Sequence, residues 1–326
     1  MKKLLILPYF GKFNNYFRLW LYSCCNNPDI DWLIITDIDI KETLPDNVKL
    51  VKKSLSEIKK SFEFKLGLKL NLEKPYKLCD YKPFYGFLFS EYLEGYDFWG
   101  YCDCDLIFGN ISHFLSNEIF EKYDKIMRTG HLSFIRNKKE INELFFKYDT
   151  YRITLTTPVI YGYDESVYGY HLGFAGEMLE NGYSFYQNDG IVADVDFRYF
   201  PFYVVSEPKT PCIFFYEDGV TYRIDRTNDG YVKREVMYVH LQKRKMELMD
   251  EIAAEKYLIC PNRFQEYNEN QLLRDEFWKS NFENRNDYFD FKAERLESKK
   301  RDFWRLFYEP HKLDCIKYRL KGERRA

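Results

Sequence analysis

The chain has 326 residues, of which 45% are hydrophobic and 31% charged, and this composition excludes a protein that is disordered throughout. It contains 49 lysines and arginines against 51 aspartates and glutamates, and a net charge of −2 argues against a dedicated nucleic-acid-binding protein. No apolar run approaches the roughly 18 residues of a membrane span, and the N-terminal apolar stretch lacks the cleavage site of a signal peptide. We therefore expect a cytoplasmic protein with no nucleic-acid partner.

The first third of the chain alternates between strand-like and helix-like segments. Apolar runs typical of buried parallel strands lie at residues 2–10, 31–37, 48–52 and 96–103. Helical patterns lie between these runs, at residues 14–25, in a segment that begins at Ser54, and at 78–93. This alternation predicts an α/β fold with a mixed, mostly parallel sheet that is flanked by helices.

The rest of the chain is less regular. Helices and two short strands are expected over residues 113–148, and residues 212–239 have the pattern of antiparallel strands joined by glycine-containing turns. The sequence has no internal repeat and no flexible linker. We therefore predict one main domain at residues 1–260 and a helical, basic C-terminal extension at 261–326 that packs on it.

The most informative segment is an Asp-x-Asp motif, Asp103-Cys104-Asp105, at the end of the predicted strand 96–103. Carboxylates at this place project into the crevice where open α/β sheets bind ligands. They suit a hard divalent cation, which can bridge them to phosphate oxygens and stabilise a departing diphosphate. The pair therefore predicts a metal site, with Asp103 also close to the bound nucleotide. The alternative is a structural role, in which one aspartate caps the next helix and the other is exposed.

The resemblance of the chain to a known family rests on five segments between residues 4 and 246. They are LPYFGKFNNYFRLWLYSC, IDWLIITD, PYKLCDYKPFYG, YDFWGYCDCDLIFGN and YVHLQKRKM. Their order resembles the GT-A glycosyltransferases, and more narrowly a bacterial family associated with capsule and lipopolysaccharide synthesis. The resemblance implies a Rossmann-like GT-A fold and transfer of a hexosyl group from a nucleotide-sugar, with UDP expected as the nucleotide. The acceptor would be a glycan or a lipid-linked oligosaccharide in surface-polysaccharide biosynthesis.

The resemblance also implies which residues hold the nucleoside. In the GT-A fold these lie at the ends of the first and second strands, which correspond here to Pro8, Tyr9 and Phe10, and to Thr36 and Asp37. An aromatic ring can stack on the base, and a carboxylate can accept a hydrogen bond from the ribose or the base. Alternatively, Tyr9 and Phe10 belong to the core and Asp37 to a turn.

A second group of residues precedes the Asp-x-Asp strand. GT-A enzymes often carry a basic residue and an aspartate there that contact the diphosphate and the donor sugar, which implies Lys77 and Asp80, with Lys82 also nearby. The alternative for Asp80 is an interaction with the positive end of a helix dipole.

The resemblance further implies that a late histidine completes the metal site. His240 follows a predicted strand, and the cations Lys243 and Arg244 come shortly after it, suited to the charge of a diphosphate. The ligands would then be Asp103, Asp105 and His240. Because imidazole suits Mn²⁺ better than Mg²⁺, we expect Mn²⁺, with Mg²⁺ as the alternative. A histidine with a purely structural or exposed role is the competing interpretation.

An acidic pair, Asp164 and Glu165, lies about sixty residues after the Asp-x-Asp motif. Inverting GT-A enzymes place such a pair near the acceptor hydroxyl, where one member acts as the general base. Either residue fits this role, and both fit a structural role at a helix N-terminus. An inverting mechanism is favoured over a retaining one, in which the two acids would only orient the acceptor.

The end of the chain, residues 292–326, contains 12 basic and 6 acidic residues, a local charge of +6. Such a segment either contacts the inner face of the cytoplasmic membrane or packs on its own domain. Two other functions remain as alternatives to the glycosyltransferase: a catalytically inactive carbohydrate-binding or scaffold protein, and a nucleotidyltransferase.

Overall fold

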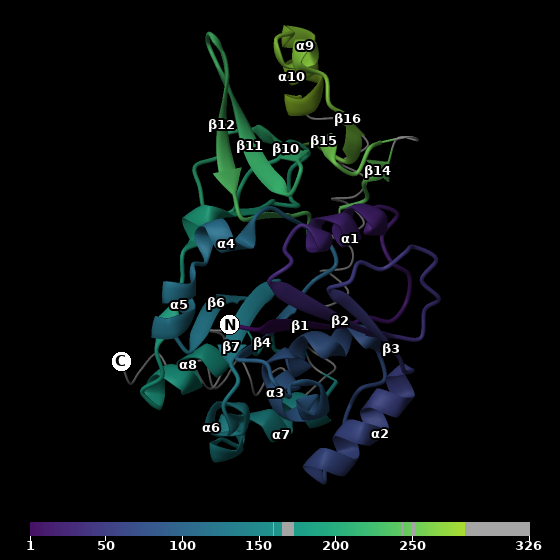
Figure 1. Cartoon of the computed structure of the whole chain (residues 1–326), viewed down its shortest axis with the longest axis vertical. Coiled ribbons are helices and arrows are strands. Elements are labelled where there is room, and N and C mark those ends of the chain that lie inside the picture. The colour runs from purple at the N-terminus through teal and green to yellow at the C-terminus, as the bar shows by residue number, and fades with distance from the viewer. Residues whose placement is uncertain (159, 165–172, 243, 249–251, 284–326) are drawn as a thin grey trace, which may run out of the picture.

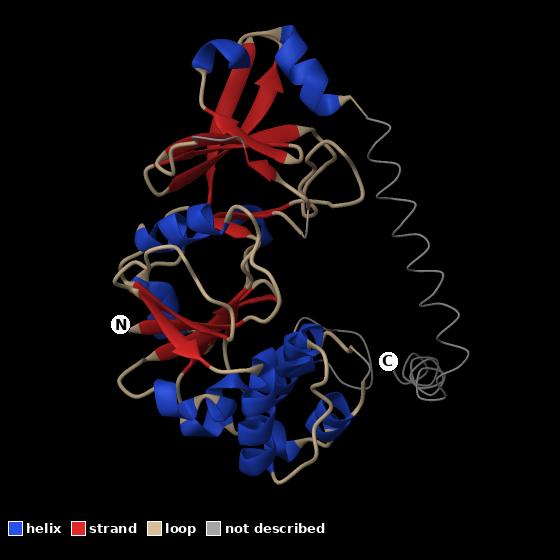
Figure 2. Ribbon diagram, turned by 90° about the vertical axis from the view of Figure 1, so that its right-hand side faces the viewer, coloured by secondary structure: helices blue, strands red, loops and turns tan. Residues whose placement is uncertain are grey.

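The computed structural model describes residues 1–158, 160–164, 173–242, 244–248 and 252–283. Within them, two sheets lie one above the other along the long axis of the molecule (Figures 1 and 2). The larger, lower part is a seven-stranded sheet with helices on both faces. The upper part is a six-stranded sheet with two short helices beyond it.

The seven-stranded sheet is mixed and mostly parallel. Its strands, in spatial order, are β3 (Val48–Lys52), β2 (Ile30–Thr36), β1 (Lys3–Pro8), β4 (Phe98–Cys102), β7 (Leu132–Arg136), β6 (Lys125–Thr129) and β8 (Phe185–Tyr186). The first four run parallel, β7 is antiparallel to both of its neighbours, and β8 is parallel to β6. This arrangement confirms the predicted α/β fold and places β4 at the centre of the sheet.

Both faces of this sheet are buried, which explains the continuous apolar runs of its strands. In β1, Leu4 and Ile6 pack into one core cluster while Leu5 and Leu7 pack into another, as the two-residue period of a strand requires. The first cluster lies against α2 (Leu55–Leu66), α3 (Tyr85–Leu88), α6 (Lys139–Asn142), α7 (Thr150–Thr156) and α8 (Gly173–Glu180). The second lies against α1 (Phe17–Cys25), α4 (Ile111–Phe114) and α5 (Asn117–Lys122).

The predicted helix at residues 78–93 is wrong in type. The chain instead forms a 3₁₀ helix, η1 (Pro75–Phe84), followed by the single turn of α3 and a second 3₁₀ turn, η2 (Ser90–Tyr92). Pro83 lies near the end of η1, where its missing N–H group prevents an unbroken α-helical ladder. Shorter 3₁₀ turns are η3 (Leu144–Lys147) and η4 (Asp189–Ile191).

The six-stranded sheet contains the antiparallel strands that were predicted for residues 212–239. Its order is β12 (Gly230–Val236), β11 (Val220–Thr227), β10 (Cys212–Glu217), β15 (Lys256–Cys260), β16 (Arg263–Glu266) and β14 (Glu247–Leu248). The helices α9 (Glu269–Leu272) and α10 (Asp275–Phe282) contribute to the core cluster on one face of this sheet. The antiparallel pair β15–β16 crosses the predicted domain boundary at residue 260. Residues 292–326 lie outside the described residues.

A third sheet has only three strands, in the order β5 (Leu106–Phe108), β13 (Tyr238–His240) and β9 (Val192–Asp194). Its residues alternate between two core clusters. Leu106 and Tyr238 pack with α1 and the seven-stranded sheet, whereas Ile107 and Val239 pack with the six-stranded sheet. The small sheet therefore joins the two larger ones.

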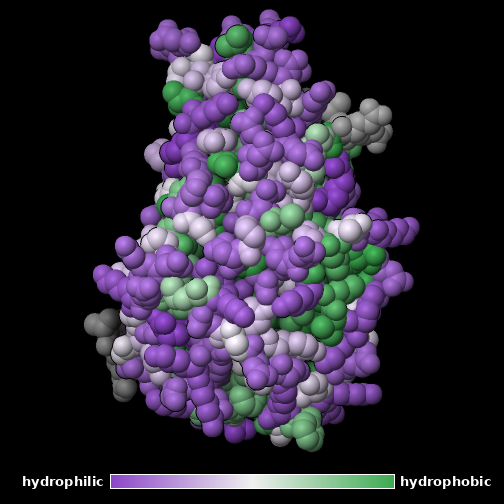
Figure 3. Space-filling view, viewed as in Figure 1, coloured by the Kyte–Doolittle hydropathy of each residue, from purple (hydrophilic) through white to green (hydrophobic). Residues whose placement is uncertain are grey.

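The surface seen in Figure 3 is mainly hydrophilic, with hydrophobic side chains gathered on its right-hand side. Among the described helices, none combines the length and the apolar character that crossing a bilayer requires.

Candidate active site

A cavity of about 930 Å³ opens at one edge of the seven-stranded sheet. The carboxyl ends of β1, β4, β6 and β8 meet at this edge, since these strands run in the same direction. Ligand sites of open α/β sheets occur at this place. The charged groups and histidines that line the cavity are Lys82, Asp103, Asp105, Arg128, His131, Asp164, Asp189, Asp194 and His240.

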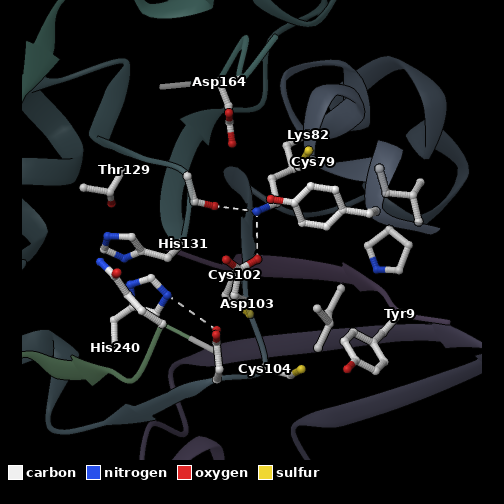
Figure 4. Close-up of a pocket in the computed structure, with 18 of the residues that line it drawn as sticks. Tyr9, Cys79, Lys82, Cys102, Asp103, Cys104, Thr129, His131, Asp164 and His240 are labelled. Carbon is white, nitrogen blue, oxygen red and sulfur yellow. Dashed lines mark hydrogen bonds and ion pairs between the residues drawn. The ribbon is translucent and has the colours of Figure 1, made fainter. Parts of the chain in front are cut away.

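Asp103 directly follows β4, as the sequence predicted. Its Oδ1 atom accepts a hydrogen bond of 2.7 Å from Lys82 Nζ, which also donates to the carbonyl oxygen of Gly130 at 2.6 Å (Figure 4). Burial by itself would lower the pKa of Lys82, but the neighbouring carboxylates of Asp103 and Asp164 hold it well above its ordinary value. Lys82 is therefore a fixed positive charge beside the Asp-x-Asp motif.

Strand register brings Asp105, His240 and Asp194 side by side. In the three-stranded sheet, His240 is opposite Leu106 on one side and opposite Asp194 on the other. Asp105 immediately precedes Leu106, and its carbonyl oxygen accepts the Leu241 N–H at 2.9 Å. His240 Nδ1 lies 2.7 Å from Asp194 Oδ1, and His240 Nε2 lies 3.6 Å from Asp105 Oδ1.

The two carboxylates control the charge of His240. Burial alone would lower the pKa of this imidazole, but Asp105 and Asp194 together raise it to about 10. Burial would likewise raise the pKa of Asp194, yet the hydrogen bond from His240 and the positive charge of that ring keep it below its ordinary value. The ring is thus held between two acids, with one nitrogen directed at each.

Two overlapping sets of side chains have the spacing of a metal site. Asp103, Asp105 and His240 each offer one ligand atom, and these atoms lie within 4.8 Å of one another; His131, Asp194 and His240 satisfy the same condition. Two carboxylates with one imidazole form a donor set that suits Mn²⁺, so the chemistry of the first set fits the predicted metal. In the second set, His240 Nδ1 and Asp194 are already hydrogen-bonded to each other.

His131 is the neighbour of His240 in this cavity. The two rings stack with their centroids 4.2 Å apart, and His131 Nδ1 lies 2.9 Å from the Tyr238 hydroxyl. Burial lowers the pKa of His131 to about 3, with the charge of His240 acting in the same direction. His131 is therefore neutral, and it supports the face of the His240 ring.

The residues predicted to hold the nucleoside are only partly at the cavity. Pro8, Tyr9 and Phe10 line it, and the Tyr9 ring stacks on Phe13 with centroids 4.6 Å apart. Thr36 and Asp37 do not line it. Thr36 is buried and accepts the N–H of Ile38, and Asp37 is exposed.

The predicted contact of Lys77 and Asp80 with the diphosphate is not what the geometry shows. Both side chains are buried away from the cavity, and their charges pair at 2.7 Å. Asp80 also accepts the backbone N–H groups of Tyr161, Gly162 and Tyr163, at distances between 2.8 and 3.4 Å. The prediction followed the sequence position of this acid, whereas the structure uses it to anchor the loop that precedes Asp164.

Asp164 lies at the cavity, and Figure 4 shows its carboxylate pointing inward. Its side chain is nearly buried, with 4% of the residue surface exposed. Glu165, the other member of the predicted acidic pair, lies outside the described residues.

Arg244 does not reach the cavity. Its guanidinium is buried and donates to the carbonyl oxygens of Asp196, Tyr199 and Phe200. The prediction followed the closeness of Arg244 to His240 in the sequence, but the Arg244 N–H donates to the Leu241 carbonyl oxygen and its side chain is buried in the protein. Lys243 lies outside the described residues.

Three residues at the cavity were missed or underrated in the sequence. Lys82 was noted only beside Lys77, although its position five residues further along η1 directs it to Asp103. His131 had no motif around it. Asp194 ends a strand of only three residues, so its pairing with His240 depends on a long-range register that local patterns do not encode.

Comparison with known proteins gives one family match and distant structural similarities. Residues 5–268 match the model of a protein family that is described as a family of unknown function (DUF6625). Among curated proteins, none matches this sequence. Two structures of the glycosyltransferase GlyE of Streptococcus pneumoniae TIGR4 share 15% identity with a TM-score of 0.32 (the apo form) and 13% identity with a TM-score of 0.31. Each alignment covers 58% of this chain and 46% of that structure, so the chain matches less than half of its length. A similarity this distant does not establish a shared activity.

Proposed function

The chain belongs to the DUF6625 family, whose description assigns no activity, and we propose from the site itself that it is a metal-dependent glycosyltransferase. The donor would be a nucleotide-sugar, with UDP favoured, and the acceptor a glycan or lipid-linked oligosaccharide of a surface polysaccharide. The resemblance of its motifs to GT-A enzymes supports these finer assignments. Location in the cytoplasm, with residues 292–326 at a membrane surface, stays a prediction.

The observation that carries the proposal is the meeting of Asp103, Asp105 and His240 in one cavity. The two aspartates follow β4 and His240 ends β13, which are far apart in the sequence, and the three side chains meet at the sheet edge where open α/β sheets bind ligands. A purely structural role would not require three ligand atoms within 4.8 Å of one another beside a large cavity.

Asp103, Asp105 and His240 would hold the divalent cation. When bound, the cation neutralises charge on the diphosphate as the bond to the sugar breaks. Lys82 donates to Asp103 and adds a second positive charge at the same place. Pro8, Tyr9 and Phe10 form the wall on which the nucleoside would lie.

Asp164 is the base that we propose for an inverting reaction. Its carboxylate takes the proton of an acceptor hydroxyl, and the hydroxyl oxygen forms the new bond to the anomeric carbon. The bond between that carbon and the diphosphate oxygen breaks, and the nucleoside diphosphate leaves with the electron pair. Glu165 is the alternative base.

The test is a thermal-shift screen of UDP, GDP, CDP and ADP, of the corresponding triphosphates and of free sugars, each with Mn²⁺, with Mg²⁺ and with EDTA. A ligand at 100 times its Kd stabilises the folded state by about 2.7 kcal/mol, which is readily measured. We expect one nucleotide to stabilise the protein only when the metal is present. The corresponding nucleotide-sugars are then tested for release of the nucleoside diphosphate.

The outcomes separate the alternatives. Stabilisation by a nucleoside triphosphate with release of pyrophosphate would indicate a nucleotidyltransferase instead. Stabilisation by free sugars, with no response to any nucleotide in either metal, would indicate a carbohydrate-binding protein, and the proposed activity would then be wrong.

A further inference from the structure

We infer that Arg128 binds an anionic group of the substrate, a phosphate or a carboxylate. This subsite and the proposed nucleoside-binding residues Pro8, Tyr9 and Phe10 lie on opposite sides of the Asp-x-Asp motif. The inference deepens the proposed function and rests on it for the identity of the substrate as a sugar. It assigns Arg128 as the residue that selects a charged acceptor or a charged sugar over a neutral one.

The order of strands places this subsite. β6, which carries Arg128, lies two positions from β4 and three from β1 in the sheet. With about 4.8 Å between neighbouring strands, Arg128 lies on the order of 10 Å from the Asp-x-Asp strand and 14 Å from the strand before Tyr9. A diphosphate bound at Asp103 and a nucleoside at Tyr9 leave the β6 side of the cavity for the sugar and the acceptor.

The backbone of β6 is distorted where it meets the cavity. Met127 and Arg128 together lie opposite the single residue Ser133 of β7, which defines a β-bulge. Met127 is fully buried and has a φ of +60°, a conformation that is rare for a bulky side chain. Ser133 Oγ donates to the Met127 carbonyl oxygen at 2.6 Å and stabilises this geometry. Bulges of this kind redirect a side chain, here Arg128 at the cavity.

The guanidinium of Arg128 is available to a ligand. The structure records no hydrogen bond or ion pair of this side chain with any residue that it describes. The nearby acid, Asp189, instead accepts from the Gln187 side-chain amide, and Gln187 Oε1 accepts the Arg128 backbone N–H at 2.8 Å. The backbone of Arg128 is thus fixed, while its charge has no counterpart among the described residues.

The other cations of the cavity have partners. Lys82 is paired with Asp103, and His240 is held between Asp105 and Asp194. A planar guanidinium is suited to bidentate binding of a carboxylate or a phosphate, and a charge-assisted hydrogen bond of this kind is strong. An anionic substrate group is therefore the partner that fits Arg128.

The experiment measures binding of small sugars to the full chain by calorimetry at constant ionic strength. The probes are glucose, glucuronic acid, glucose 6-phosphate and inorganic phosphate, each titrated with and without saturating UDP and Mn²⁺. The wild-type protein is compared with Arg128→Gln, with Arg128→Lys, and with Arg152→Gln as a control that removes one charge from α7, away from the cavity.

We expect at least one anionic sugar to bind the wild-type protein about 10-fold or more tightly than glucose, the size of effect that a hydrogen bond to a charged group gives. Arg128→Gln should abolish this preference, Arg128→Lys should keep part of it, and Arg152→Gln should keep all of it. None of the three should change the affinity for UDP with Mn²⁺ by more than about 2-fold.

Three results would overturn the inference. Glucose could bind as tightly as the anionic sugars, inorganic phosphate could bind as tightly as glucose 6-phosphate, or Arg128→Gln could weaken UDP binding in place of sugar binding. The last result would assign Arg128 to the donor diphosphate. If UDP does not bind at all but Arg128→Gln still removes the preference for anionic sugars, the subsite stands and the proposed function fails.

Discussion

His240 donates from Nδ1 to the Asp194 carboxylate at 2.7 Å, which leaves its Nε2 directed at Asp105. The contact joins paired residues of β13 and β9, and Gln242 donates to the same Asp194 oxygen at 2.7 Å. A carboxylate behind a metal-binding imidazole fixes the orientation of the ring and leaves the other nitrogen to bind the metal, which displaces the proton of that nitrogen. Asp194 is thus a positioning residue for the proposed metal site.

Asp194→Ala should weaken Mn²⁺ binding by about 10–100-fold, the usual cost of losing such a partner. Calorimetric titration of Mn²⁺ in the presence of UDP measures this loss, and ¹⁵N spectra of the histidine ring should show that the Nδ1-protonated form is no longer fixed. Asp189→Ala serves as the control, because Asp189 lines the same cavity and pairs with Gln187 instead of His240. Equal Mn²⁺ affinity in the wild type and Asp194→Ala would exclude the positioning role.

Asp105→Ala should abolish the metal-dependent part of nucleoside-diphosphate binding, since the carboxylate supplies charge to a cation and little packing. The melting temperature without ligands should fall only modestly, because His240 loses Asp105 but keeps Asp194 as its acidic neighbour. The measurement is the thermal shift with UDP, with and without Mn²⁺. An undiminished response to Mn²⁺ in this variant would show that the metal lies elsewhere, with the set of His131, Asp194 and His240 as the next candidate.

Lys82→Met should change the affinity for Mn²⁺ alone and the affinity for UDP with Mn²⁺ in different ways. In the wild type, Lys82 Nζ occupies Asp103 Oδ1 at 2.7 Å, so its removal frees that oxygen for a cation. Mn²⁺ alone should therefore bind with unchanged or higher affinity, whereas UDP with Mn²⁺ should bind about 10-fold less tightly because a positive charge near the diphosphate is lost. Parallel titrations measure both affinities. A loss of Mn²⁺ affinity without UDP would contradict this account.

Asp80→Ala should act through the loop that leads to Asp164. Breaking a buried ion pair by removing one partner costs about 3–5 kcal/mol, and three backbone N–H groups of the loop also lose their acceptor. We expect a large fall in stability and in turnover, with UDP affinity nearly unchanged. In the double variant with Lys77→Met, the stability loss should be smaller than the sum of the two single losses. Additive losses would show that the pair is not coupled.

The sequence predicted the parts of the site that depend on local patterns. The apolar run of β4 followed by Asp103 and Asp105 identified both the strand and the edge at which the carboxylates lie. The position of His240 near the end of a strand was also recognisable from a few residues, and the structure makes it the last residue of β13. Its partner Asp194 was not, because the register of three short strands depends on packing between the two larger sheets.

The predicted site residues that lie outside the cavity do so for a common physical reason. Asp80 and Arg244 are charged residues in the expected places, and local sequence contains no direct measure of whether such a side chain faces a cavity or the protein interior. Each is buried and paired with groups from distant segments: Asp80 with the backbone of residues 161–163, and Arg244 with carbonyl oxygens between residues 196 and 200. Buried charges require such partners, and only the folded chain supplies them.

The loop before Asp164 is also held from the other side, by Glu177 on α8. Tyr163 donates from its hydroxyl to Glu177 Oε2, and both residues are buried, with 3% and 1% of their surfaces exposed. Glu177 Oε1 has no hydrogen-bond partner in the part of the chain that the structure describes. Burial raises the pKa of Glu177 to about 7, from an ordinary value of 4.5.

A raised folded-state pKa means that the folded protein retains a proton that the unfolded chain releases. The stabilisation of the folded state by protonated Glu177 is therefore complete below about pH 4.5 and is lost as the pH rises towards 7.

Glu177→Gln cannot ionise, so its free energy of unfolding relative to the wild type should increase by about 2–3 kcal/mol between pH 4.5 and pH 8. Denaturant titrations across this range measure the difference, and Glu140→Gln, which removes an exposed carboxylate from α6, serves as the control. The amide oxygen that Glu177→Gln introduces can still accept the Tyr163 hydroxyl, so the loop should keep its position while losing its dependence on pH. A difference between variant and wild type that stays constant from pH 4.5 to 8 would show that Glu177 titrates normally and does not carry this dependence.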